Sequence, residues 1–132
     1  MLKGFDEQTQ QLTDYEEQTL LPVIIAGLRC KYGSDMAVTN KYIVGRLQPR
    51  YKITDSRLRK VINHIRVNDM IPGLVATSNG YYIATSEEEM ADYIESLRGR
   101  EDAIRAVRLA MERQCRQLYR QDDALQGELI FS

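Results

Sequence analysis

The stretch at residues 54–68 constrains the fold most, because its side chains can bury a continuous face only if the backbone is helical. Apolar residues recur there at the i, i+3, i+4, i+7 spacing of one helical stripe, namely Leu58, Val61, Ile62 and Ile65. Thr54 or Asp55 can cap the helix, since a short side-chain oxygen accepts hydrogen bonds from the free N–H groups of the first turn. The opposite face is basic and amide-bearing, with Ser56, Arg59, Lys60 and Asn63 at its centre and Arg57, His64 and Arg66 at its flanks.

Two further helices are expected before this one. Thr13 and Glu16 have the spacing of a capping box and start a helix that runs to about Cys30. Pro22 must kink or split this helix, because proline removes one backbone hydrogen bond and its ring clashes with the preceding turn. A very short strand at 37–38 and a second helix at 41–47, capped by Thr39-Asn40, complete this part of the chain.

A β-hairpin is expected after the basic helix. Residues 74–77 and 81–84 are short β-prone runs around Ser78-Asn79-Gly80. Asn-Gly supplies the positive φ angles of a type I′ turn, which makes it a strong hairpin signal. Tyr81 and Tyr82 alternate across the second strand, so one ring is expected in the core and the other at the surface. Residues 74–84 contain no lysine or arginine, so neither the strands nor the turn of this hairpin carries a positive charge.

The pattern from residue 86 to about 120 predicts one long helix. Apolar residues recur in it at intervals of seven, the spacing of a seam between paired helices, at Met90, Leu97, Ile104, Met111 and Leu118. Little other chain remains to cover the later part of this seam. We therefore predict an interface with a second copy or with a helical protein partner, made by Ile104, Val107, Met111 and Leu118.

The charges are unevenly distributed, although the formal net charge is only −1. Residues 36–66 contain eight lysines and arginines against one acidic residue, Asp55, whereas the segments on both sides are net acidic. A concentrated basic segment is the footprint of a nucleic-acid-binding protein. An acidic protein partner would be attracted to it as well.

Other classes of function find little support in the sequence. Cys30, Cys115 and the single histidine His64 make no zinc ligand set at the usual spacings. A glycine-rich phosphate loop and a nucleophile elbow are both missing, so we expect no enzyme, no cofactor and no metal. The longest apolar run is too short to span a membrane, no signal peptide is evident, and two free thiols suit a reducing compartment. We expect a cytoplasmic protein with no membrane partner.

Three runs of the chain carry a resemblance to a known family. They are V-T-N-K-Y-I-V-G-R-L at 38–47, I-T-D-S-R-L-R-K-V-I-N-H-I-R at 53–66 and G-L-V-A-T-S-N-G-Y-Y-I-A at 73–84. Together they resemble the winged-helix DNA-binding domains of bacteriophages and related mobile elements, and are more loosely similar to the amino-terminal domain of the biotin-ligase repressor. The resemblance covers residues 13–120 and is most specific at 54–84. It implies a mainly α fold with a small β-hairpin (α+β), a winged helix-turn-helix whose third helix enters the major groove.

The chain departs from that pattern in two places. About six or seven residues separate Leu47 from Asp55, where the plain motif has a turn of three or four. The hairpin loop, which would be the wing, is minimal and carries no cation. We expect four segments: a loose lead-in at 1–12, a winged-helix domain at 13–85, a long C-terminal helix with possible dimerisation at 86–120, and a flexible tail at 121–132.

The first hypothesis is a small duplex-DNA-binding protein of phage or mobile-element type, acting in transcriptional control or as an accessory factor in replication or recombination. Arg and Lys suit phosphates or guanine edges, and Asn suits adenine. Toward bases we place Ser56, Arg59, Lys60 and Asn63, and toward phosphates Arg50, Lys52, Arg57 and His64. The second hypothesis is a protein-interaction adaptor on the same scaffold. A third is single-strand binding by stacking on Tyr81 or Tyr82.

Overall fold

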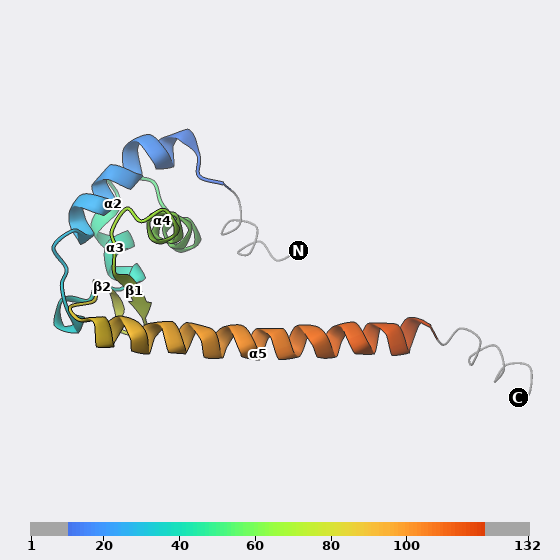
Figure 1. Cartoon of the computed structure of the whole chain (residues 1–132). Helices are drawn as coiled ribbons and strands as arrows, with labels where there is room; N and C mark the ends of the chain where they lie inside the picture. The colour runs from blue at the N-terminus through green and yellow to red at the C-terminus, as the bar shows by residue number, and fades with distance from the viewer. Residues whose placement is uncertain (1–10, 121–132) are drawn as a thin grey trace, which may run out of the picture. The chain divides into compact units, whose positions relative to one another are not determined.

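The computed structural model describes residues 11–120. Figure 1 shows a mainly helical chain with one small hairpin and a long last helix. The elements are η1 (Glu16–Leu20), α2 (Leu21–Leu28), η2 (Ser34–Met36), α3 (Asn40–Leu47), α4 (Asp55–Val67), β1 (Leu74–Thr77), β2 (Gly80–Ile83) and α5 (Glu87–Tyr119). The predicted α+β composition, with its hairpin and its long C-terminal helix, is thereby confirmed.

The chain divides into two compact units, one ending at Met90 and the other starting at Ala91. The predicted tail at 121–132 and residues 1–10 of the predicted lead-in lie outside the described residues. The rest of the lead-in is engaged, because Leu12 packs against the core and the Gln11 carbonyl accepts a hydrogen bond from Arg57.

Helix α4 forms where the apolar stripe predicted it and contributes the most deeply buried side chains. Leu58, Val61, Ile62 and Ile65 are each 2% exposed or less. Thr54 is the N-cap, and its hydroxyl accepts from the Arg57 N–H at 3.2 Å. The helix ends where Asp69 adopts a φ of 57° and the Met70 N–H donates to the Ile65 carbonyl at 3.0 Å, the pattern of a Schellman cap.

The first helical segment starts at the predicted capping box. The Thr13 N–H donates to Glu16 Oε1 at 2.8 Å, and the Glu16 N–H donates to the Thr13 hydroxyl at 3.1 Å. Pro22 then splits the segment, because η1 is a π-helical turn and α2 restarts with Pro22 in its first turn. In the wider π turn the Leu21 N–H donates to the Glu16 carbonyl. The regular α-helical hydrogen-bond pattern is interrupted just before Pro22, which has no N–H to continue it.

The hairpin occupies the expected place but not the expected turn. Strand β1 pairs antiparallel with β2, with Thr77 opposite Gly80. Ser78 and Asn79 have no positive φ, whereas Gly80 has a φ of 120°. The type I′ prediction is therefore wrong, because the left-handed residue is the first of β2 and lies outside the two-residue loop.

The outer edge of β2 is paired by two short contacts with the chain before α3. Val38 and Tyr81 exchange backbone hydrogen bonds at 2.8 and 3.1 Å, so the short strand predicted at 37–38 is a single antiparallel bridge. Ile83 forms a parallel bridge with Tyr32. At Gly80 an added Cβ would lie 2.5 Å from the backbone of Val38, so only glycine fits this crossing.

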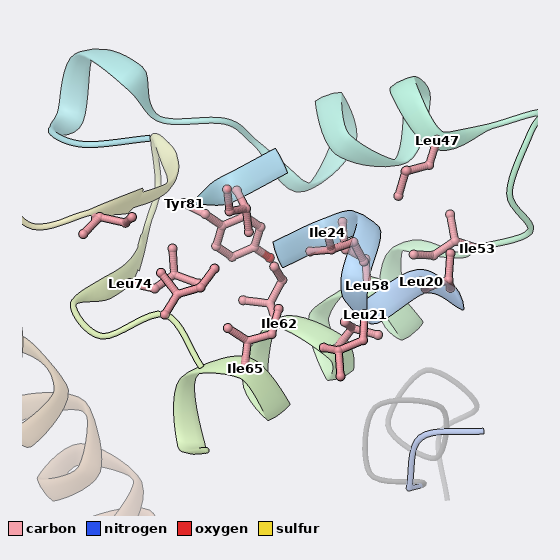
Figure 2. Packing of buried hydrophobic residues seen from close by; sticks show 14 residues of the cluster. Leu20, Leu21, Ile24, Leu47, Ile53, Leu58, Ile62, Ile65, Leu74 and Tyr81 are labelled. Atoms are coloured by element: carbon pink, nitrogen blue, oxygen red, sulfur yellow. The ribbon is translucent and has the colours of Figure 1, made fainter. Parts of the chain in front are cut away.

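One hydrophobic core joins the elements of the first unit. Figure 2 shows buried side chains of the first helical segment, Leu20, Leu21 and Ile24, gathered with those of α4. Leu47 and Ile53 close one end of this core, and Leu74 and Tyr81 bring in the hairpin. The core thus anchors one face of α4 and fixes which of its side chains can face outward.

Candidate nucleic-acid interface

The outward face of α4 carries the side chains that the sequence assigned to bases. Arg59 and Asn63 are exposed, and Ser56 and Lys60 are half-buried. At about 100° per residue these positions lie opposite the buried stripe. Within residues 11–120, the side chains of Arg59, Lys60 and Asn63 make no hydrogen bond or ion pair. Their donors are therefore directed to solvent or to a ligand, on a helix whose other side is fixed.

Arg57 has a different role from the phosphate contact predicted for it. Its guanidinium forms an ion pair with Glu16, in which Nε donates to Glu16 Oε2 at 2.6 Å and Nη2 donates to Oε1. Nη2 also donates to the Gln11 carbonyl at 3.0 Å, and the side chain is only 13% exposed. Arg57 lies on the flank of α4 that faces η1, so its positive charge is paired within the protein and is not available to a phosphate.

The charge of Glu16 depends on this contact. Burial by itself raises the pKa of the Glu16 carboxyl, but the hydrogen bonds from Arg57 and Thr13 and the positive charge of Arg57 outweigh it. The pKa therefore lies below its ordinary value, and the buried carboxylate stays ionised. The capping box was evident in the sequence; the ion pair was not, because its partners lie 41 residues apart.

The connection before α4 carries two more of the predicted phosphate contacts. Arg50 and Lys52 are exposed. The loop that carries them is held by Gln48, whose side chain donates to the Ile53 carbonyl at 2.8 Å. It is also held by the Tyr15 hydroxyl, which accepts from the Lys52 N–H at 3.0 Å. These two contacts give a long connection a defined path, and sequence reasoning missed both.

His64 lies on the same flank as Arg57 and is half-buried. The Asn68 side chain donates to the His64 carbonyl at 2.9 Å and lies 3.4 Å from Nδ1 of the ring. The imidazole therefore lies beside the Asn68 side chain in the last turn of α4.

A polar network ties the start of α4 to α3 and to the hairpin. The Tyr81 hydroxyl donates to Asn40 Oδ1 at 2.9 Å, and the Asn40 amide donates to the carbonyl and carboxylate of Asp55 at 3.2 and 3.3 Å. Burial raises the pKa of the Tyr81 phenol, and the positive charges of Arg59 and Arg66 oppose this rise only in part. The network orients the start of α4, where Ser56 lies in the first turn and Arg59 follows in the second.

Both tyrosines of β2 are unsuited to stacking on a base. Tyr81 is 8% exposed and Tyr82 is 9% exposed, so the prediction that one ring lies at the surface is wrong. Alternation along a strand exposes one side only when that face of the sheet meets solvent, and here β2 is buried along its whole length. The single-strand-binding hypothesis required an exposed ring at Tyr81 or Tyr82, and neither ring is exposed.

An apolar groove of about 260 Å³ runs between α2 and α3. Val23, Gly27 and Ile43 are among its lining residues, and the cations Lys31 and Arg46 also border it. The long helix carries the other apolar surface, where the predicted interface residues Ile104, Val107, Met111 and Leu118 are 70, 60, 51 and 63% exposed.

Among residues 11–120 there is no group of three histidine, cysteine, aspartate or glutamate side chains that could hold a metal ion. No described helix combines the length and the apolar character needed to cross a membrane. Comparison of the chain with protein-family models, curated proteins and solved structures found no match.

Proposed function

We propose that this protein is a winged-helix protein that binds duplex DNA through the outward face of α4. The observation that carries the proposal is the division of α4 into a face buried in the core and an outward face whose Arg59, Lys60 and Asn63 side chains have no hydrogen-bond or ion-pair partner within residues 11–120. The order of elements supports it: a first helical segment, a one-residue bridge at Val38, α3, α4 and a hairpin. In such a fold the third helix enters the major groove.

The site follows from this geometry with one change from the sequence hypothesis. Ser56, Arg59, Lys60 and Asn63 are directed to bases, and Arg50, Lys52 and His64 to phosphates, while Arg57 belongs to the fold. The hairpin loop carries no cation, so α4 and the loop before it supply the electrostatic affinity. The process is transcriptional control or an accessory step in replication or recombination, in a phage or related mobile element.

The test is fluorescence anisotropy with a mixed-sequence duplex at several salt concentrations. Wild type is compared with the double variant Arg59→Glu, Lys60→Glu. Arg59 and Lys60 bring positive charge into the groove between the phosphate backbones, so the double variant should lose most of its affinity at low salt and show a shallower dependence of log affinity on log salt. The matched control is Arg113→Glu, Arg116→Glu on α5, which changes the net charge equally and should bind as wild type. Equal binding by all three proteins contradicts the proposal.

The groove between α2 and α3 favours a second candidate, a protein-interaction adaptor on the same scaffold. An apolar groove bordered by Lys31 and Arg46 suits an amphipathic acidic segment of a partner. This candidate stands if wild type shows no duplex binding at low salt, or if charge reversal on α4 leaves that binding unchanged.

We also infer that α5 pairs with another helix. Four apolar side chains on this helix are more than half exposed, namely Ile104, Val107, Met111 and Leu118, and paired helices bury apolar side chains of this kind. Pairing would join two DNA-binding units, which could then contact two half-sites.

A further inference from the structure

We propose that α5 pairs with the α5 of a second copy of this chain in antiparallel orientation, about a two-fold axis near Ile104. This inference deepens the proposed helix pairing and does not depend on DNA binding. It rests on two charged residues in the seam, Glu101 and Arg108, which are placed symmetrically about Ile104 and Arg105.

The seam of α5 is defined by its heptad spacing. Leu97, Ile104 and Met111 form its apolar line, and the adjoining flank carries Ile94, Glu101, Arg108 and Cys115, again seven apart. All of these side chains are exposed in the described chain. Arg108 also donates to Glu112 at 2.8 Å on its own helix, which leaves further donors of the guanidinium for a second carboxylate.

A parallel, in-register pair is unfavourable for this seam. In that arrangement each seam residue faces its own copy, so Glu101 would meet the partner's Glu101 and Arg108 would meet the partner's Arg108. A parallel pair that used the opposite flank of the apolar line, residues 100 and 107, would also be unfavourable. Arg100 lies on that flank and would face the partner's Arg100. With either flank, a parallel pair therefore brings like charges together at a partly desolvated interface.

An antiparallel pair converts the same residues into attractive contacts. A two-fold interface is self-complementary, so that if residue i contacts residue j, then j contacts i. With the axis between Ile104 and Arg105, Glu101 lies level with the partner's Arg108, and the symmetry repeats the contact. Leu97 then lies beside the partner's Met111, and Ile104 packs beside its own copy. Charge complementarity thus selects a second copy of this chain as the occupant of the seam.

Charge exchange in the full-length chain tests the orientation, with the dimer dissociation constant measured by analytical ultracentrifugation. Glu101→Arg turns both symmetry-related attractions into repulsions and should weaken the dimer about ten-fold. Arg108→Glu should do the same, and the double exchange Glu101→Arg, Arg108→Glu should restore wild-type affinity. The matched control Asp102→Arg makes an equal charge change on the adjacent residue outside the seam and should leave the dimer intact.

Disulfide formation gives a second readout. In a Cys30→Ser background, the two copies of Cys115 of an antiparallel dimer lie roughly 30 Å apart at 1.5 Å per residue, beyond the reach of a disulfide. Ile94→Cys places a thiol level with the partner's Cys115 and should give a cross-linked dimer on mild oxidation. Glu95→Cys, on the other side of the helix, should not.

Three results would overturn the proposal: a monomer at tens of micromolar, a dimer that Glu101→Arg does not weaken, or rapid cross-linking of Cys115 to its own copy. None of these results depends on DNA, so failure of the orientation is separable from failure of the DNA-binding proposal. A protein that dimerises as described but ignores duplex DNA would leave the seam assignment in place.

Discussion

Removal of the Arg57 guanidinium should destabilise the first unit far more than removal of any exposed cation. Arg57→Ala leaves Glu16, which is 4% exposed, without its counter-ion and with one remaining backbone donor at Thr13. Breaking a buried ion pair by removing one partner costs about 3–5 kcal/mol. Because the two side chains retain 13 and 6% of their exposure, we expect a loss near the lower limit, about 3 kcal/mol.

The assay is urea unfolding followed by tyrosine fluorescence and circular dichroism. With a slope of about 1–1.5 kcal/mol per molar urea for a unit of this size, the midpoint should fall by about 2 M or more. Arg59→Ala on the same helix is the matched control, since this exposed arginine has no partner in the described chain, and its effect should stay within about 0.5 kcal/mol. The double variant Glu16→Gln, Arg57→Ala should lose less than the two single losses combined.

The pH dependence gives an independent check of the same contact. The folded state holds the pKa of the Glu16 carboxyl below its ordinary value of 4.5. The ionised carboxylate therefore stabilises the folded state above about pH 4.5, and this stabilisation is lost as the pH falls through the lowered pKa. The stability difference between wild type and Arg57→Ala should therefore narrow in acid. The reasoning is refuted if Arg57→Ala costs less than about 1 kcal/mol at neutral pH, the value of an exposed pair.

Two backbone substitutions give further predictions, both measured by thermal unfolding. Gly80→Ala should cost more than about 2 kcal/mol, because φ is 120° and the new Cβ would lie 2.5 Å from the Val38 backbone. Its control is Gly45→Ala, whose Cβ meets nothing within 4 Å and which should stabilise α3 by roughly 0.5–1 kcal/mol; similar effects of both substitutions would contradict the turn geometry. Asp69→Gly should stabilise the cap of α4 by about 1 kcal/mol, since Asp69 has a φ of 57° and side chains other than glycine are strained there. Asp69→Ala should have the opposite sign, and a gain from alanine would show that the left-handed cap does not persist in solution.

Local patterns predicted the elements well because they depend on neighbours in the chain. The stripe at Leu58, Val61, Ile62 and Ile65 and the cap at Thr54 involve residues within one or two turns, and they produced α4 at the expected place. The box of Thr13 and Glu16 did the same for the first segment. The local signal was misleading at the turn, where the backbone of Val38 lies against Gly80, and at Tyr82, because both faces of β2 are buried.

The sequence by itself determined which segments are helical, where the hairpin lies, which face of α4 is apolar and that residues 36–66 are basic. Only the tertiary structure decided which cations of that segment are available to a ligand. Arg57 and Arg59 are equivalent by residue type and differ by two positions in one helix, yet one pairs with Glu16 and the other faces outward. Periodicity places a side chain on a flank of its helix, but what lies across from that flank can be far away in the sequence, 41 positions in the case of Arg57 and Glu16, and only the packed core brings such residues into contact.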